Sequence, residues 1–177
     1  AEISLAANFS PVLASSQTYN PNAVFSGLTA NTVYYVQVKA INNDTVSTAF
    51  TNLGSTSTLA IAPTAAPFSG VTTSALQANW TAPGNPTNVT LYHAEISLAS
   101  DFSTVLASSQ TYNPNATFSG LTANTVYYGR VKSINNNSIS TAFTDLSSKS
   151  TLAIAPTAAA FSGVTTSALQ ANWTAPG

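Results

Sequence analysis

The sequence predicts an all-β protein built from repeated two-sheet sandwiches, and three observations support this fold class. The 177-residue chain repeats itself with a period of 93 residues. Short apolar stretches of alternating polarity are separated by turn residues, which is the pattern of antiparallel strands. No segment of ten or more residues has the period of an amphipathic helix. About seven strands in roughly 90 residues indicate a sandwich of two packed sheets.

The two copies of the repeat are almost identical. The segment Ala1–Ala6 recurs as Ala94–Ala99, and the register holds without a gap as far as residues 84 and 177. Of the 84 aligned pairs, 70 are identical and 14 differ. The second copy lacks only the equivalents of residues 85–93. We therefore expect the same strands in both copies.

The strands are assigned from their alternation of apolar and polar side chains. The clearest one covers residues 33–41, where Tyr34, Val36 and Val38 face the core and Tyr35 and Lys39 face outward. Two further strands follow the same rule, with the inward residues Leu76, Ala78 and Trp80 in one and Tyr92, Ala94, Ile96 and Leu98 in the other.

One difference between the copies falls in this core pattern. Gly129 stands where the first copy has Val36, so an inward β-branched side chain is lost. We expect a local void or a bulged strand at Gly129, and a higher melting temperature when valine replaces it.

Charge and composition exclude several classes of function. Only nine residues are charged and the net charge is -1, so nothing attracts nucleic acid or an anionic membrane. The longest apolar runs are a few residues, far below the roughly 20 that a membrane-spanning helix needs. Cysteine and methionine are absent, which excludes disulfides and thiolate metal sites. The uncharged surface, rich in Ser, Thr and Asn, predicts an extracellular or cell-surface protein.

No arrangement of residues in the sequence suggests catalysis. His93 is the only histidine, so neither a histidine pair for a metal nor a supported catalytic triad is expected. Glu95 and Asp101 are single acids, and Asp44 is replaced by Asn137 in the other copy. We predict that the protein is not an enzyme and uses no cofactor or metal.

The asparagine-rich segments 42–45 and 135–138 are predicted to be turns, because they have too few carboxylates for a calcium site. Asn-x-Ser/Thr occurs seven times, where composition alone gives about five, so the excess is small. The candidate glycosylation sites, which would make surface glycans a partner, are Asn43, Asn88, Asn115 and Asn136.

These residues also resemble a known family, the fibronectin type III domain. The resemblance runs in order through residues 74–84, Tyr92, 118–128 and 131–135. It implies an immunoglobulin-like seven-stranded β-sandwich with a core tryptophan and a tyrosine corner. The residues to which it assigns these structural roles are Trp80, Trp173, Leu28, Thr32, Tyr34, Leu121, Thr125 and Tyr127.

The resemblance also implies that the chain is permuted relative to its domains. Residues 1–60 would be the last five strands of one domain, 63–153 a complete domain, and 156–177 the first two strands of a third. The short connectors contain proline and predict a semi-rigid rod. The incomplete pieces need completion, either by further repeats of a longer covalent array or by strand exchange between identical chains joined head to tail.

The function predicted from these features is structural. Near-identical units suit a linear rod or filament outside the cell, such as a surface fibre, stalk or spacer, in which the partner of the protein is itself. The alternative is a carbohydrate-binding or spacer module of a large secreted hydrolase or adhesin.

Overall fold

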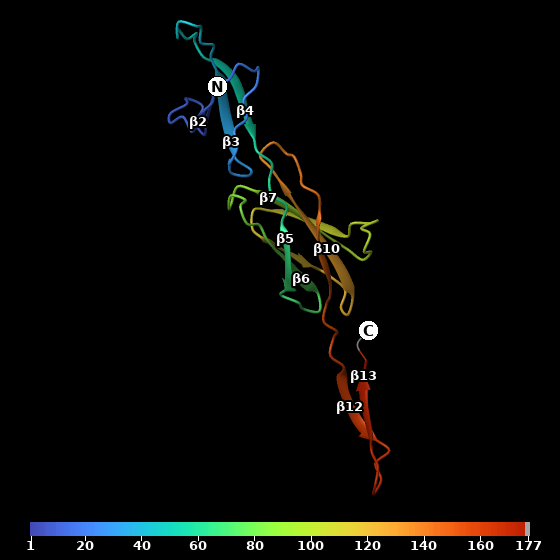
Figure 1. Ribbon diagram of the computed structural model, residues 1–177. Helices are drawn as coiled ribbons and strands as arrows, with labels where there is room; N and C mark the ends of the chain where they lie inside the picture. The colour runs from blue at the N-terminus through green and yellow to red at the C-terminus, as the bar shows by residue number, and fades with distance from the viewer. Residues whose placement is uncertain (176–177) are drawn as a thin grey trace.

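The computed structural model describes residues 1–175, and these residues form strands, turns and irregular segments without any helix. No helix long and apolar enough to cross a membrane is therefore found in this part of the chain. The 13 strands form three groups that follow one another along the long axis of the molecule (Figure 1). The all-β fold class predicted from the sequence is confirmed.

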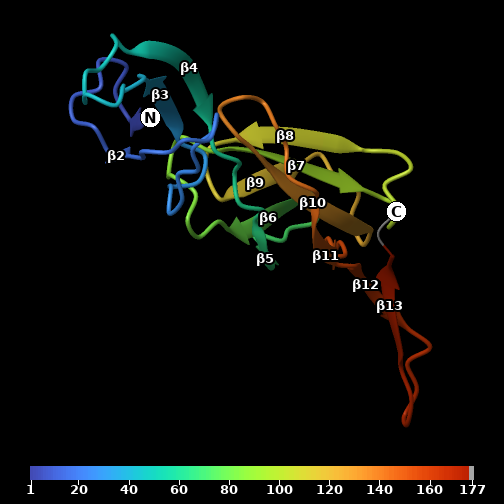
Figure 2. The same ribbon diagram turned by 45° about the horizontal axis from the view of Figure 1, so that its top comes forward.

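The middle group is a complete sandwich of two antiparallel sheets (Figure 2). One sheet has the order β5-β6-β9, with bounds β5 (Thr64–Ser69), β6 (Ala75–Thr81) and β9 (Asn115–Ser119). The other has the order β11-β10-β7-β8, with bounds β7 (Leu91–Ser97), β8 (Ala107–Thr111), β10 (Val126–Ile134) and β11 (Thr144–Ser150). These seven strands with this order make an immunoglobulin-like sandwich.

The core of this sandwich lies between the sheets, where the alternation of each strand directs apolar side chains inward. Trp80 of β6 is buried and its ring centroid lies 5.6 Å from that of Tyr92 on β7. The buried apolar residues of the core are Leu76, Ala78, Trp80, Tyr92, Ala94, Ile96, Ala116, Phe118, Tyr127, Val131 and Leu146. The facing predicted for β6 therefore agrees with the burial of its side chains.

The predicted inward position of Leu98 is wrong. Strand β7 ends at Ser97, so the alternation stops one residue earlier and Leu98 lies exposed. Ser97 takes the buried place instead, and its hydroxyl donates a hydrogen bond to the carbonyl of Thr104 at 2.8 Å. A short polar side chain is accepted there because its hydroxyl has a partner.

The N-terminal group forms a single four-stranded sheet of order β2-β1-β3-β4. Its bounds are β1 (Glu2–Ser4), β2 (Ala14–Ser15), β3 (Val33–Val38) and β4 (Thr51–Ser57). Five strands were expected in residues 1–60, but residues 22–26, the counterpart of β9, form none. In the middle group β9 pairs with β6, and the N-terminal group has no equivalent of β6 to offer that segment its hydrogen bonds.

The C-terminal group is a bare hairpin of β12 (Thr157–Ser162) and β13 (Gln170–Thr174). Residues 156–177 were expected to form the first two strands of a domain, and the last two of these residues lie outside the described part. The hairpin extends beyond the middle group (Figure 1). Trp173 on β13 is largely exposed.

The environment of Gly129 differs from the expected void. A Cβ atom added to Gly129 would lie 2.6 Å from Cζ of Phe68, because this ring fills the space that a larger residue would occupy. The pairing of β10 with β11 does shift register between Tyr128 and Arg130. The same shift occurs between Val36 and Gln37, so the bulge does not arise from the glycine.

Because of this packing, a larger residue at position 129 should lower the stability of the middle domain instead of raising it. The substitution Gly129→Ala should lower the unfolding free energy by about 1–3 kcal/mol, because the added methyl group overpacks the core against Phe68. Thermal unfolding of the middle domain measures the change. The double variant with Phe68→Leu should recover part of the loss, and an unchanged melting temperature for Gly129→Ala would contradict this assignment.

Candidate functional site

Each unit of a repeat protein contacts its neighbours, so the junction between two units is a candidate functional surface. Here the loop that joins β10 to β11 reaches the end of the N-terminal sheet (Figure 2). Three consecutive asparagines of that loop contact residues of the first group. Loop positions next to rigid strands hold side chains in fixed directions, so these contacts determine how the two groups meet.

Asn31 is the centre of the junction. It is only 1% exposed and takes a left-handed backbone conformation with φ of 45°, which asparagine tolerates better than most residues. Its amide Nδ2 donates to the hydroxyl of Thr90 at 2.9 Å, and its Oδ1 accepts from the backbone N–H of Asn136 at 2.7 Å. Nδ2 of Asn136 returns a hydrogen bond to the carbonyl of Asn31 at 3.0 Å. The two asparagines thus hold each other across the junction.

Two further amides extend this contact on either side. Asn135 donates through Nδ2 to the carbonyl of Thr58 at 3.1 Å. Asn137 donates through Nδ2 to the hydroxyl of Thr56 on β4 at 2.9 Å. Three successive side chains therefore bind three different parts of the first group, which restrains rotation as well as separation.

The connector between the groups is fixed to the middle domain. Asn85 pairs with both backbone groups of Ile61, accepting from its N–H at 2.8 Å and donating to its carbonyl at 2.7 Å. Ser133 also donates to the carbonyl of Ile61 at 2.8 Å, and Thr144 donates to that of Pro63 at 2.8 Å. A connector bonded in this way cannot act as a flexible hinge.

Gly84 lies beside the connector and has φ of +83°, a backbone conformation that favours glycine. A Cβ atom there would lie 2.8 Å from Cδ1 of Ile61, so a larger residue would also displace the end of the Ile61 side chain.

The chemistry of the junction is that of neutral amides and hydroxyls. Every side-chain bond described above joins uncharged groups, so no step of protonation or ion pairing is needed to form it. Neutral hydrogen bonds are little screened by salt, in contrast to surface ion pairs. The junction is therefore suited to holding two units at a constant angle under varied conditions.

The contribution of Asn31 can be isolated with a matched control. Asn124 occupies the same repeat position with φ of 48° and is exposed, so both alanine variants carry the same backbone cost. In dilute monomeric protein, Asn31→Ala should speed amide hydrogen exchange at Asn136 by at least about fivefold, because a lost hydrogen bond costs about 1 kcal/mol or more.

NMR-detected hydrogen exchange gives this rate, and Asn124→Ala should leave it unchanged. Equal rates in the two variants would show that Asn31 does not hold the junction.

A second group of side chains lies on the outer face of the β7–β10 pair. Glu95 accepts from Nε of Arg130 at 2.7 Å, and its other oxygen lies 2.9 Å from Nε2 of His93. The guanidinium of Arg130 lies between the rings of Phe102 and Phe143, 4.2 and 4.1 Å from their centroids. Burial alone would raise the pKa of Glu95, but the hydrogen bonds from His93 and Arg130 outweigh it and lower that pKa.

This cluster makes a pH-dependent contribution to stability. Because the pKa of Glu95 is lower in the folded protein, its ion pair stabilises the fold above the unfolded pKa of about 4.3 and is lost as pH falls through the folded value. Glu95→Gln should reduce the unfolding free energy by about 1 kcal/mol at pH 7 and by progressively less below about pH 4.

Chemical denaturation across this pH range measures the effect. The control variant is Glu2→Gln, which removes the carboxylate at the equivalent position of the first copy. This carboxylate accepts a hydrogen bond from the neutral side chain of Gln37, so its loss should lower the unfolding free energy at pH 7 by less than Glu95→Gln does. A cost for Glu95→Gln that does not change with pH would contradict the ion-pair account.

The structure places the predicted structural residues at equivalent points of the first two groups. The phenol oxygens of Tyr34 and Tyr127 each accept a hydrogen bond at 2.9 Å, from the backbone N–H groups of Thr29 and Thr122. The predicted threonines and leucines lie beside these tyrosines. The hydroxyls of Thr32 and Thr125 donate hydrogen bonds to the carbonyls of residues 30 and 123. Leu28 and Leu121 are half-buried. Of the two tryptophans, Trp80 is buried and Trp173 is exposed.

The candidate glycosylation sites have different surroundings. Asn43 and Asn88 are exposed, while Asn115 is half-buried in β9 opposite Asn79. Nδ2 of Asn136 is bound to Asn31, so a glycan on this nitrogen would break the junction. No group of three or more His, Asp and Glu side chains that could hold a metal is found within residues 1–175.

Sequence reasoning treated the asparagine-rich segments only as turns and missed their contacts with the neighbouring unit. A signal was available in a comparison of the two copies. Asn31, Asn135 and Asn136 each have an asparagine at the equivalent position of the other copy. By contrast, Asp44 corresponds to Asn137 and Thr56 corresponds to Lys149, so these two positions change together. The structure shows that positions 137 and 56 contact each other.

The described residues form one complete β-sandwich joined to a second sheet of the same strand pattern. The sequence profile of the fibronectin type III domain matches residues 62–148. These residues therefore form a domain of the fibronectin type III family. No curated protein matches the chain.

Three of the solved structures similar to this chain are each less than 20% identical to it. A titin structure is 19% identical, with 68% of this chain and 41% of that chain covered and a TM-score of 0.45. Domains d3–d4 of the rat CD45 extracellular region are 14% identical, with 78% and 74% covered and a TM-score of 0.46. The sixth fibronectin type III domain of human fibronectin type III domain containing protein 3 is 18% identical, with 55% and 91% covered and a TM-score of 0.43.

Proposed function

We propose that the chain is a structural element of an extracellular rod or filament, in which near-identical fibronectin type III units are joined at a constant angle. A fibronectin type III domain is typically a non-catalytic structural or binding module. The work of such a protein is mechanical, and its working surface is the junction between units.

The observation that supports this proposal is the junction of Asn31 with Asn136. Both residues have identical counterparts in the other copy, Asn124 and Asn43. Asn124 and Asn43 allow the same contact between asparagines to form with further units, and equal steps generate a straight or regularly winding rod.

The surface composition supports a location outside the cell. With nine charged residues in 177, adjacent units repel each other little, and only four Lys and Arg side chains are available to trypsin-like proteases. The alternative function, a carbohydrate-binding or spacer module of a secreted hydrolase or adhesin, has no separate observation within the described residues that favours saccharide binding over spacing.

Rigidity of the junction is the property that tests the proposal. The chain has no cysteine, so spin labels can be attached at Ser55→Cys and Ser148→Cys, two exposed and equivalent positions of the first and second units. Pulsed electron paramagnetic resonance should give one narrow distance distribution, because the asparagines and the fixed connector allow one arrangement.

Adding Asn31→Ala and Asn135→Ala should broaden this distribution, whereas adding Asn124→Ala should not. A broad distribution with the native junction would mean that the units are flexibly linked and would contradict the rod.

A further inference from the structure

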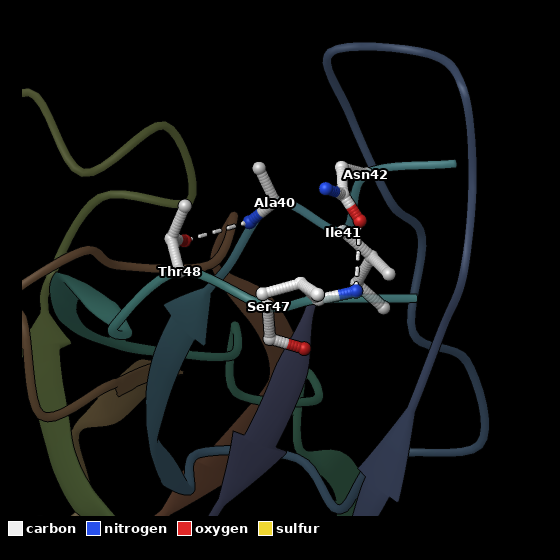
Figure 3. A pocket seen from close by; sticks show the side chains of 6 residues that line it. Ala40, Ile41, Asn42, Ser47 and Thr48 are labelled. Atoms are coloured by element: carbon white, nitrogen blue, oxygen red, sulfur yellow. Dashed lines mark hydrogen bonds between the residues drawn. The ribbon is translucent and has the colours of Figure 1, made fainter. Parts of the chain in front are cut away.

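The loop between β3 and β4 lines a shallow hollow with residues 40–48 (Figure 3). The polar groups beside this hollow bind one another. The hydroxyl of Thr48 accepts from the N–H of Ala40 at 3.1 Å, and Oδ1 of Asn42 accepts from that of Val46 at 2.8 Å. The same two bonds hold the loop between β10 and β11, which carries the junction. The hollow is therefore part of a loop that the repeat uses for its junctions, and it offers no separate site for a ligand.

The edges of the sheets are the other places where this protein can bind a partner, because edge strands carry free backbone N–H and C=O groups. Three of the four edge strands of the middle domain are protected against such pairing. β5 contains Pro67 and a shift of register relative to β6. β11 contains Asp145, Lys149 and a shift of register relative to β10. β9 begins directly after Pro114, which has no N–H to donate.

The fourth edge strand, β8, has none of these protections. It lies at the edge of the sheet β11-β10-β7-β8, and its five residue pairs with β7 run without a shift of register. Residues 103–113, which include β8, contain no charged residue and no proline. Charges, prolines and bulges are what normally keep an edge strand from pairing with another chain. β8 is therefore the edge of the middle domain that is open to the addition of a strand.

The side chains along β8 are complementary to those of a second copy of β8. In an antiparallel pair centred on Ser109, Leu106 of one copy lies opposite Tyr112 of the other, and Ser108 lies opposite Gln110. Leu106 and Tyr112 are 49% and 53% exposed in the single chain, and the twofold axis would cover each of them twice. Ser108 and Gln110 are exposed and neutral, so they can exchange hydrogen bonds between these apolar pairs.

The neutral sequence of β8 favours a second copy over an unrelated peptide as its partner. A twofold axis through Ser109 places every residue of β8 beside the same strand of the other copy, so any charge would lie near its own equivalent. The charges of this sheet face are held on β7 and β10, where Glu95 and Arg130 bind each other. A peptide that is recognised through its charge would find no charged group on β8 to bind.

We propose that β8 of the middle domain pairs antiparallel with β8 of a second copy, so that two identical chains join their four-stranded sheets edge to edge around a twofold axis. The partner is a copy of this chain that binds side by side. The junction described above is made by the loop between β10 and β11, whereas β8 is the edge of the sheet opposite β11, so both contacts can form together.

Charges placed on β8 test this pairing. In the variant Ser108→Lys with Gln110→Lys, lysines of the two copies face each other, and in Ser108→Glu with Gln110→Glu the glutamates do so. Both positions are exposed, so both variants should fold. By sedimentation equilibrium the native chain should dimerise, and each variant should bind itself at least about tenfold more weakly, because like charges then lie opposite each other. An equimolar mixture of the two variants should regain native affinity.

The matched control carries the same charges on the first unit. Ser15 and Gln17 are the exposed equivalents of Ser108 and Gln110, so Ser15→Lys with Gln17→Lys has the same net charge and should dimerise as the native chain does. A native chain that is monomeric up to about 1 mM would overturn the proposal. Equal weakening by the control, or a mixture of the lysine and glutamate variants that stays monomeric, would overturn it as well.

Hydrogen exchange locates the contact on the native chain. Alternate backbone amides of β8 should exchange more slowly as the protein concentration rises, because a second strand then binds them. The amides of β11, at the other edge of the same sheet, should not change. Slower exchange at β11 with no change at β8 would assign the contact to a different edge and overturn the proposal.

The pairing of β8 goes beyond the proposed rod and does not depend on it. The spin-label distance across the Asn31 junction is measured within one chain and can be obtained in the monomeric lysine variant of β8. A narrow distance in a chain that does not dimerise would leave the rod in place and remove only the side-by-side partner. Dimers with a broad distance would do the reverse.

Discussion

The structure depends on one constraint, which is that each four-stranded sheet has an apolar face that must be covered. In the middle domain the hairpin β5–β6 covers it, and Trp80 is buried against Tyr92 between the sheets. Where the hairpin is separated from its sheet, identical side chains lie in solvent. Burying a side chain of this size contributes about 1.5–3 kcal/mol, so the packing of the hairpin on its sheet is a main source of the stability of the middle domain.

The protein uses neutral and charged groups for different purposes. Buried amides such as Asn31 connect units, because a satisfied neutral hydrogen bond costs little to bury compared with a charge. The cluster of Glu95 and Arg130 lies instead on an outer sheet face, where the aromatic rings of Phe102 and Phe143 support the guanidinium.

Much of the fold follows from local sequence patterns, and the exceptions have physical reasons. Alternation correctly predicted the buried face of β6, since period two is a property of any strand. It could not predict where β7 ends, so Leu98 was misplaced. It could not predict that the Phe68 ring fills the space beside Gly129, which depends on another strand. The contacts of Asn31 were missed because they join residues 105 positions apart and leave no periodic signal.

The polarity of the chain has a consequence for any filament that it forms. Each junction joins the loop between β10 and β11 of one unit to a different surface of the unit before it, so every step points the same way and the two tips of a filament are chemically different.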